Sequence, residues 1–184
     1  MSKWYALQVM TGKETDVAAR LRQAGIHATA PARAAIERRG GRLEVTRRAL
    51  LPGYVLVECD MTVQLYYHLA RKPFVIRFVN GPGQVAAPIP DEQMRAISGL
   101  MLRYDSALEA GVSRGRRTAD GSIEIISGPL TLIDKADIIK MDARRNRATI
   151  RITLYDETYE TDMALTIDDD TNTDNADTTD DMQP

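Results

Sequence analysis

The 184-residue sequence predicts an α+β protein made of two modules in series, the second of them all-β. In residues 3–102, strand-like segments alternate with segments of helical periodicity, whereas residues 121–163 form short runs of alternating polar and apolar residues. Such runs, separated by turns, are typical of a small barrel. We therefore expect a first domain at 1–102, a flexible linker at 103–120, a second domain at 121–166 and a disordered acidic tail at 167–184.

The first module begins with a strand at residues 3–9, followed by a helix that Gly25 ends. Thr11 and Glu14 have the spacing of a capping box at the start of this helix. Further strands are predicted at 54–58 and 74–79. Thr62 is expected to cap a second helix and Pro90 to introduce a third.

The charge of the chain is distributed unevenly. The formal net charge is −2, but residues 168–184 hold seven aspartates and neither lysine nor arginine, which leaves 24 basic and 19 acidic residues elsewhere. Two arginine-rich arms flank Gly40-Gly41, a dipeptide that favours a protruding β-hairpin. An arginine-rich hairpin indicates an acidic partner such as RNA, although a solvated hairpin face explains the same pattern equally well.

Composition argues against several classes of protein. No apolar run approaches the 18 or so residues of a membrane-spanning helix, and the single cysteine, Cys59, excludes an internal disulfide. His27 and His68 have no partners at the spacing of a catalytic or zinc motif. We therefore expect a non-enzymatic cytoplasmic protein without catalytic residues, cofactor or metal.

Several motifs occur together in a characteristic order. They are Trp4-Tyr5, the turn 11–14 into a helix, the segment 51–57 (Leu-Pro-Gly-Tyr-Val-Leu-Val), Pro73-x-Val75, Pro88-Ile89 and, in the second module, Gly128-Pro129-Leu130. In this order they resemble NusG-type transcription factors, which have an NGN domain and a KOW domain. The resemblance implies a four-stranded antiparallel NGN sheet flanked by helices, of ferredoxin/RNP-like type, and a five-stranded SH3-like KOW barrel.

The resemblance also implies a function. NGN domains of this family bind the clamp helices of the largest catalytic subunit of RNA polymerase, hold the clamp closed and suppress pausing. The expected contact is a shallow apolar patch with few charges at its centre. In this sequence the residues that would form it are Trp4, Tyr5, Leu50, Leu51, Pro52, Gly53 and Tyr54. On composition alone, Trp4 and Tyr54 are better explained as core aromatics and Pro52-Gly53 as an ordinary turn. The resemblance reverses this preference for Leu51 and Tyr54 and leaves both interpretations open for Trp4.

Two departures from the housekeeping pattern favour a specialised paralogue. Leu51 stands where an aromatic residue is usual, and residues 131–137 lack the second glycine that bends the KOW strand. Together with the arginines, these features resemble LoaP-type antiterminators, which act on selected operons and recognise a hairpin in nascent RNA. The candidate RNA-binding residues are Arg33, Arg38, Arg39, Arg42, Arg47, Arg48, Arg114, Arg116 and Arg117.

An alternative class is an RNA-binding or ribosome-associated protein in which the KOW module acts without polymerase. The segment 50–54 discriminates between the two hypotheses, because a ribosomal KOW protein does not need it. Under the first hypothesis the protein is a monomer that contacts polymerase and an RNA hairpin, and the partner of its KOW module is unknown.

Overall fold

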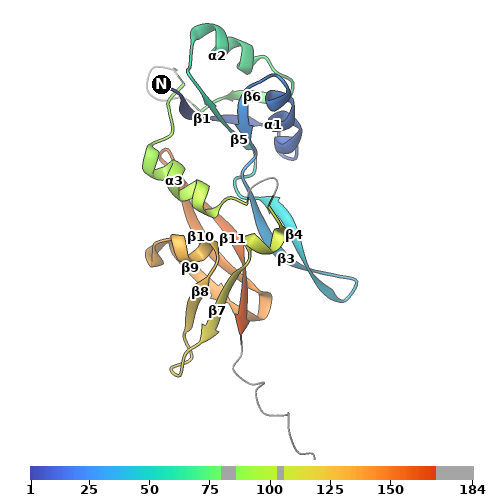
Figure 1. The fold of residues 1–184 in the computed structure, drawn as a ribbon, viewed down its shortest axis with the longest axis vertical. Helices are drawn as coiled ribbons and strands as arrows, with labels where there is room; N and C mark the ends of the chain where they lie inside the picture. The colour runs from blue at the N-terminus through green and yellow to red at the C-terminus, as the bar shows by residue number, and fades with distance from the viewer. Residues whose placement is uncertain (80–85, 103–105, 169–184) are drawn as a thin grey trace, which may run out of the picture.

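The computed structural model describes residues 1–79, 86–102 and 106–168. Its upper part is a four-stranded antiparallel sheet in the order β2-β5-β1-β6 (Figure 1). Two helices pack on one face of this sheet. The elements are β1 (Lys3–Val9), α1 (Glu14–Gln23), β2 (His27–Thr29), β5 (Tyr54–Cys59), α2 (Val63–Ala70) and β6 (Val75–Phe78).

The two helices start differently. Thr62 caps α2 as expected, since its hydroxyl accepts a hydrogen bond from the Leu65 amide at 3.2 Å. The capping box predicted for α1 is wrong, because the Thr11 side chain makes no capping hydrogen bond and Lys13 occupies the N-cap position. The carboxylate of Glu14 instead accepts hydrogen bonds from the amides of Gly12 and Gly53, at 2.8 and 2.7 Å.

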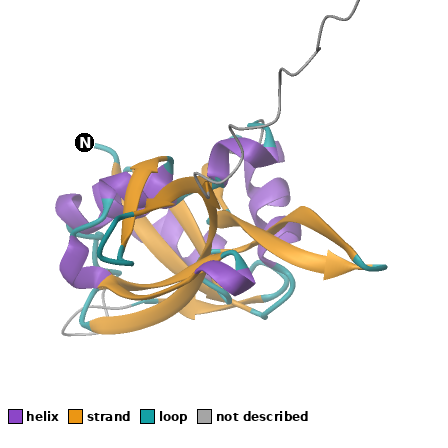
Figure 2. Cartoon of the chain, turned by 90° about the horizontal axis from the view of Figure 1, so that it is seen from below, coloured by secondary structure: helices purple, strands orange, loops and turns teal. Residues whose placement is uncertain are grey.

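The predicted arginine-rich hairpin is present and projects from the body of the molecule (Figure 2). Strands β3 (Ala32–Arg39) and β4 (Arg42–Ala49) pair over their full length, with Arg39 opposite Arg42. Gly40 and Gly41 form the turn with φ of 54° and 84°, values that glycine adopts with little steric cost.

The lower part of the molecule is a five-stranded sheet in the order β8-β7-β11-β10-β9. Helix α3 lies between the two sheets (Figure 1). The α+β class is confirmed, with an all-β second module. The bounds are α3 (Asp91–Leu100), η1 (Leu108–Gly111), β7 (Ser113–Arg117), β8 (Ile123–Ser127), η2 (Pro129–Leu132), η3 (Lys135–Asp137), β9 (Ile138–Asp142), η4 (Ala143–Arg145), β10 (Arg147–Leu154) and β11 (Glu157–Asp168), where η denotes a 3₁₀ helix.

The predicted boundaries of the second module need correction. Strand β7 falls inside the predicted linker at 103–120, yet it pairs with both β11 and β8. The barrel therefore begins at Ser113 rather than at residue 121. Arginine and glycine in 113–117 suggested a linker, but the strand needs few apolar side chains because its backbone pairs on both sides. The remainder of the acidic tail, 169–184, lies outside the described residues.

The missing second glycine of the KOW module is accommodated by a change of secondary structure. Residues 129–137 form the two 3₁₀ helices η2 and η3 instead of a bent strand. The Asp134 side chain accepts a hydrogen bond from the Ala136 amide at 3.0 Å and so caps η3. Gly128 precedes them with φ of 91°, and a β-carbon there would lie 2.5 Å from the Ser113 Cα. Gly128 thus remains the position that requires glycine.

Candidate functional site

The segment 50–54 forms a tight loop between β4 and β5. Gly53 has φ of 83°, and its carbonyl accepts a hydrogen bond from the Val9 amide at 2.8 Å. Its own amide is bound by the buried carboxylate of Glu14, as described above. The loop is thereby fixed to both β1 and the first turn of α1. Glu14 belongs to this site, and sequence reasoning had assigned it only to helix capping.

The strand β1 separates the two aromatic residues predicted for the docking patch. Side chains alternate between the faces of a sheet, so Trp4 and Tyr5 point in opposite directions. Tyr5 is buried among the residues that face α1 and α2, beside Leu7 and Val9. Trp4 lies half-buried on the other face, with its ring centroid 5.1 Å from that of His27. Of the pair, the structure places only Trp4 on the face that carries Leu51 and Tyr54.

The barrel covers this second face of the sheet. Leu50 and Leu51 are both 0% exposed and lie in one continuous apolar core with residues of α3 and of the barrel. Tyr54 packs edge-on against Tyr159 of β11, and their hydroxyl oxygens are 2.7 Å apart. The Tyr159 hydroxyl donates to Glu157, so the Tyr54 hydroxyl is the donor to Tyr159. Apolar contributors from both modules to this shared core are Ala6, Leu56, Ile89, Met94, Ile97, Leu100, Leu130, Ala148, Ile150, Ile152, Leu154, Met163 and Leu165.

The turn between β10 and β11 fastens the barrel to the first module. The Tyr155 hydroxyl accepts a hydrogen bond from the Ala6 amide at 3.3 Å and donates one to the Ala87 carbonyl at 2.8 Å. The side-chain amide of Gln93, on α3, bonds the Tyr155 backbone N–H at 2.7 Å and its carbonyl at 3.0 Å. Burial raises the pKa of Tyr155 to about 12. One residue thus makes four hydrogen bonds across the domain interface.

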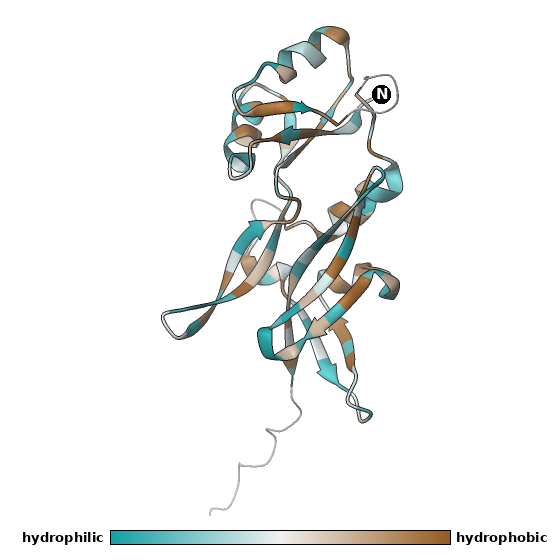
Figure 3. Ribbon diagram, turned by 180° about the vertical axis from the view of Figure 1, so that it is seen from behind, coloured by the Kyte–Doolittle hydropathy of each residue, from teal (hydrophilic) through white to brown (hydrophobic). Residues whose placement is uncertain are grey.

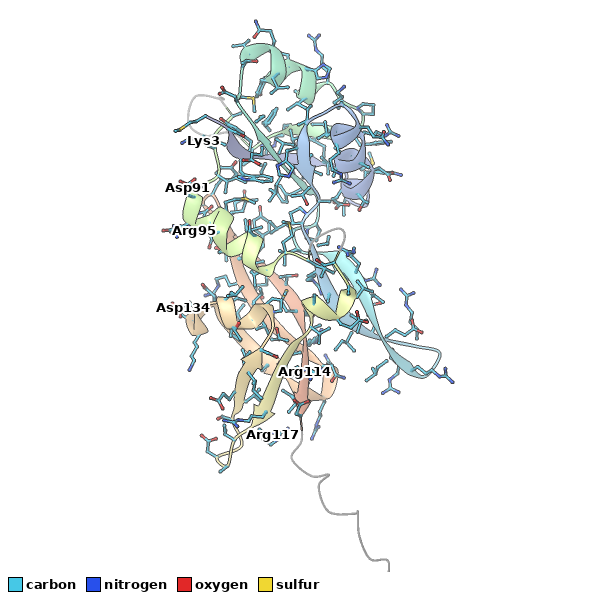
Figure 4. All side chains as sticks on the ribbon, viewed as in Figure 1. Lys3, Asp91, Arg95, Arg114, Arg117 and Asp134 are labelled. Atoms are coloured by element: carbon cyan, nitrogen blue, oxygen red, sulfur yellow. The ribbon has the colours of Figure 1, made fainter. Side chains whose placement is uncertain are left out.

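The nine candidate RNA-binding arginines fall into three groups. At the hairpin tip, Arg38, Arg39 and Arg42 are exposed. On the barrel, Arg114, Arg116 and Arg117 lie on β7; Figure 4 labels the first and last of these, well away from the hairpin. Arg116 forms an ion pair with Glu124 at 2.8 Å. The barrel arginines and the hairpin tip therefore do not form one continuous surface. The third group, at the hairpin base, is Arg33, Arg47 and Arg48.

The base arginines line a cavity of about 580 Å³ between the hairpin, the loop at Pro52 and the start of α1. Arg48 is held by Glu37 through two hydrogen bonds of 2.6 and 2.7 Å. Arg47 donates to the carbonyls of Leu102 and Ser106, each at 3.4 Å. Arg33 differs, because within the described residues its Nε is buried without a hydrogen-bond partner.

The three residues of the KOW motif lie where the barrel meets α3. Gly128 ends β8, Pro129 begins η2, and Leu130 is 1% exposed in the shared core. The Leu130 amide donates to the buried Ser113 hydroxyl at 3.0 Å. This motif has a structural role in closing the barrel.

Figure 3 shows the hydropathy of the chain, in which hydrophilic and hydrophobic residues are interspersed along the strands of both modules and along the projecting hairpin. Among the described residues, no cluster of three or more His, Cys, Asp or Glu side chains is arranged to hold a metal ion. None of the helices in the described ranges has the length and apolar character needed to cross a bilayer.

The fold and the loop at 50–54 define a two-module protein with an NGN-like sheet joined to a small barrel. A family model described as "Transcription termination factor nusG" matches residues 2–98. The chain therefore belongs to the NusG family. This match covers the first module, including the loop at 50–54, which the alternative of a KOW protein without a polymerase role leaves unexplained.

The chain is similar to individual proteins and to one solved structure. The chain is 26% identical over 162 residues to "Transcription termination/antitermination protein NusG" of Vibrio parahaemolyticus, covering 83% of this chain and 87% of the relative. It is 34% identical over 105 residues to the protein of the same description in Escherichia coli K12, covering 52% and 58%. A solved structure described as "Domain interaction in Thermotoga maritima NusG" aligns with 26% identity and a TM-score of 0.49, covering 89% of this chain and 94% of that one.

Proposed function

We propose that this protein is a transcription elongation and antitermination factor that binds the clamp helices of RNA polymerase through the face carrying Trp4, Leu51 and Tyr54. The observation that supports this is the chemistry of that face. It is apolar, free of charged side chains among its buried members, and rigidly presented by the loop that Glu14 anchors. Such a surface suits a coiled-coil tip with an apolar centre and a charged rim.

The same face is occupied by the barrel in the present conformation. A partner that binds Leu51 and Tyr54 must replace the core that they now share with the barrel, including the contact between Tyr54 and Tyr159, since two partners cannot cover one surface. We therefore propose that polymerase binds an open form, in which the barrel has moved away from α3 and the sheet. Leu51→Asp should therefore act twice, because a charge in the shared core disfavours the closed form, in which the barrel covers the sheet, as well as polymerase binding.

The experiment uses the interface that Tyr155 makes. In a pull-down with purified polymerase, Tyr155→Ala should bind more than the wild-type chain, because it loses hydrogen bonds found only in the closed form. Adding Tyr54→Ala to Tyr155→Ala should abolish that binding. The matched control is Tyr67→Ala, which removes an exposed aromatic residue on α2, away from the barrel. If the Tyr54→Ala/Tyr155→Ala chain binds as well as Tyr155→Ala alone, the docking site lies elsewhere.

We further propose that the protein selects its operons by binding a hairpin in nascent RNA through Arg38, Arg39 and Arg42. They are exposed and lie at the end of a rigid two-stranded arm, so they can reach a duplex without displacing the barrel. Basic side chains bind phosphates of any sequence, while the shape of the RNA provides selectivity.

Reversal of these three charges should weaken binding of the RNA hairpin in a gel shift, with Arg71→Glu and Lys72→Glu as the control. Equal affinity of all variants would refute the assignment.

General and operon-specific action are separated by transcription through a terminator, with and without a leader hairpin from a candidate operon. A LoaP-type factor should increase read-through only on the template that has the hairpin. Equal read-through on both templates would identify a general elongation factor.

A further inference from the structure

The base of the arginine hairpin lies against the barrel and against the segment that leads into it. Strand β3 contacts β11 of the barrel and the short helix η1 (Figure 1). Ala34 of β3 is 0% exposed, and a β-carbon on Gly111, at the end of η1, would lie only 2.8 Å from the Ala34 Cβ. The Leu102 amide donates a hydrogen bond to the Ala32 carbonyl at 2.7 Å. The hairpin base is therefore enclosed in the closed form, whereas the tip projects into solvent.

Arg33 is the one arginine of the hairpin that this packing covers. The other five, Arg38, Arg39, Arg42, Arg47 and Arg48, are exposed. The Nε of Arg33 is buried and has no hydrogen-bond partner among the described residues, and burial is also the main cause that lowers its pKa. A guanidinium N–H in this condition has lost its hydration without gaining an acceptor, which is unfavourable. Moving the barrel away would return this group to water.

A carboxylate of the barrel lies close to the covered guanidinium. Among the charged groups that act on Arg33, Asp162 of β11 has the largest effect, ahead of Arg48, which is paired with Arg33 across the hairpin. Asp162 is itself hydrogen-bonded to Arg147 at 2.6 Å and to Thr149 at 2.7 Å, both in β10. It is thus fixed to the barrel and would move with it. In the closed form Asp162 offers Arg33 a negative charge, as an RNA phosphate would in the open form.

We propose that Arg33 is an additional RNA-phosphate contact, which the barrel covers in the closed form and exposes in the open form. The tip arginines bind the RNA hairpin in both forms, and Arg33 adds its contact only after the barrel has moved. This inference rests on the RNA binding and on the open form proposed above. It has a reciprocal consequence. An RNA that binds the open form more tightly also raises the population of that form, and therefore the affinity for polymerase.

A double-mutant cycle in the full chain tests the proposal. The opening change is Gln93→Ala with Tyr155→Phe, which removes hydrogen bonds between the modules and alters no hairpin residue. In a gel shift with a labelled RNA hairpin, opening should raise the affinity roughly tenfold, as expected for one charge-assisted contact. The slope of log affinity against log salt should steepen by about 0.9, the value for one phosphate of a duplex. Arg33→Met should abolish both gains in the opened chain and change little in the closed one.

The matched control is Arg48→Met, which removes a neighbouring charge from the same hairpin. Arg48 is exposed and is held by Glu37 of β3, so its environment does not depend on the barrel. Its substitution should have the same effect on RNA affinity in the closed and the opened chain. Leu51→Asp provides a second opening change, since it places a charge in the shared core. It should produce the same gain in RNA affinity, and Arg33→Met should again abolish it.

Covering of Arg33 can also be measured without RNA. Exchange of the Arg33 Nε–H with solvent, followed by NMR, should be slow in the wild-type chain and faster in both opened chains. Equal exchange in all three would overturn the proposal, because the hairpin itself would then bury the guanidinium.

The RNA measurements distinguish this inference from the proposed function on which it rests. Equal effects of Arg33→Met in the closed and the opened chains would overturn the inference, as would opened chains that bind RNA no better than the wild type. Binding at the tip is tested separately by Arg42→Met, which should weaken RNA binding in both forms. If Arg42→Met weakens binding while Arg33→Met acts equally in both forms, the tip contact stands and the inference about Arg33 fails.

Discussion

The two faces of the N-terminal sheet are covered in different ways. One face packs against α1 and α2, which follow their strands directly in sequence, and buries Tyr5, Leu7 and Val9. The opposite face packs against α3 and against a barrel whose contributing strands lie about a hundred residues further along the chain. The first face belongs to a core formed within the first module. The second face shares its core with the barrel, which the polymerase proposed above would have to replace.

The largest predicted effect is a loss of stability from a change on the face that packs against α1 and α2. Leu7→Ala removes a fully buried side chain from the core of the first module, so we expect the free energy of unfolding to fall by about 2–5 kcal/mol. Urea denaturation followed by circular dichroism measures this loss. The matched change lies in the barrel core that covers the other face: Met163→Ala, in β11, should leave the sheet folded, and equal unfolding of the first module would show that the two faces are energetically equivalent.

A smaller effect is expected at the domain interface. Gln93→Ala together with Tyr155→Phe removes hydrogen bonds between the modules, each worth roughly 1 kcal/mol, while leaving both cores intact. The radius of gyration from small-angle scattering should increase, and the melting of each module should be retained. Gln8→Ala, whose side chain bonds Arg77 within the first module, is the control. An unchanged radius with the double change would show that the apolar core alone keeps the modules together.

The stability of the loop at 50–54 should depend on the Glu14 carboxylate that anchors it. Glu14→Gln keeps the shape of the side chain but replaces one carboxylate oxygen by an NH₂ group, which donates and cannot accept. The side chain can then no longer accept hydrogen bonds from the amides of both Gly12 and Gly53 through two oxygens. We expect a loss of about 1–3 kcal/mol in stability and faster amide exchange at Gly53. Unaltered exchange at Gly53 would mean that the loop is held by its own turn geometry.

The smallest effect depends on pH. The Tyr155 pKa is raised to about 12 in the closed form by burial, so the neutral phenol is favoured there. A group whose folded pKa is raised stabilises the fold below its ordinary pKa, near 10, and this contribution is lost as pH rises toward 12. The closed form should therefore weaken between about pH 10 and 12. Scattering at pH 8 and pH 10.5 should show less pH-dependent expansion in Tyr155→Phe than in the wild-type chain. The remaining part comes from Tyr159, which packs against Tyr54 at the same interface and whose pKa is also raised by burial.

Sequence reasoning succeeded where the signals are local. The hairpin turn at Gly40-Gly41, the Thr62 cap and the α+β class follow from short patterns, and all three are present in the structure. It failed where the deciding contact is distant. Strand β7 is recognised only by its pairing with β11 and β8, and Glu14 only by the approach of Gly53, 39 residues away.

The candidate site shows the same limit. The sequence pattern predicted Trp4, Tyr5, Leu51 and Tyr54 for one patch, but the alternation of side chains along β1 places Tyr5 on the opposite face. Nothing in the sequence indicated that Tyr155 and Tyr159 would cover the face that carries Leu51 and Tyr54, since their partners lie in another module. The grouping of the arginines likewise depends on tertiary structure, because neighbours in sequence such as Arg33 and Arg38 belong to different surfaces.

The chain between Leu102, at the end of the first module, and Ser113, at the start of β7, is short. A short tether holds the barrel near its binding face at an effective concentration in the millimolar range. If the closed form is 99% populated, a competing partner has an apparent dissociation constant about a hundredfold above its intrinsic value. The length of this tether therefore influences how tightly a partner must bind in order to displace the barrel. A glycine-serine insertion at residue 107 lengthens the tether, so it should lower the partner's apparent dissociation constant without altering a single contact residue.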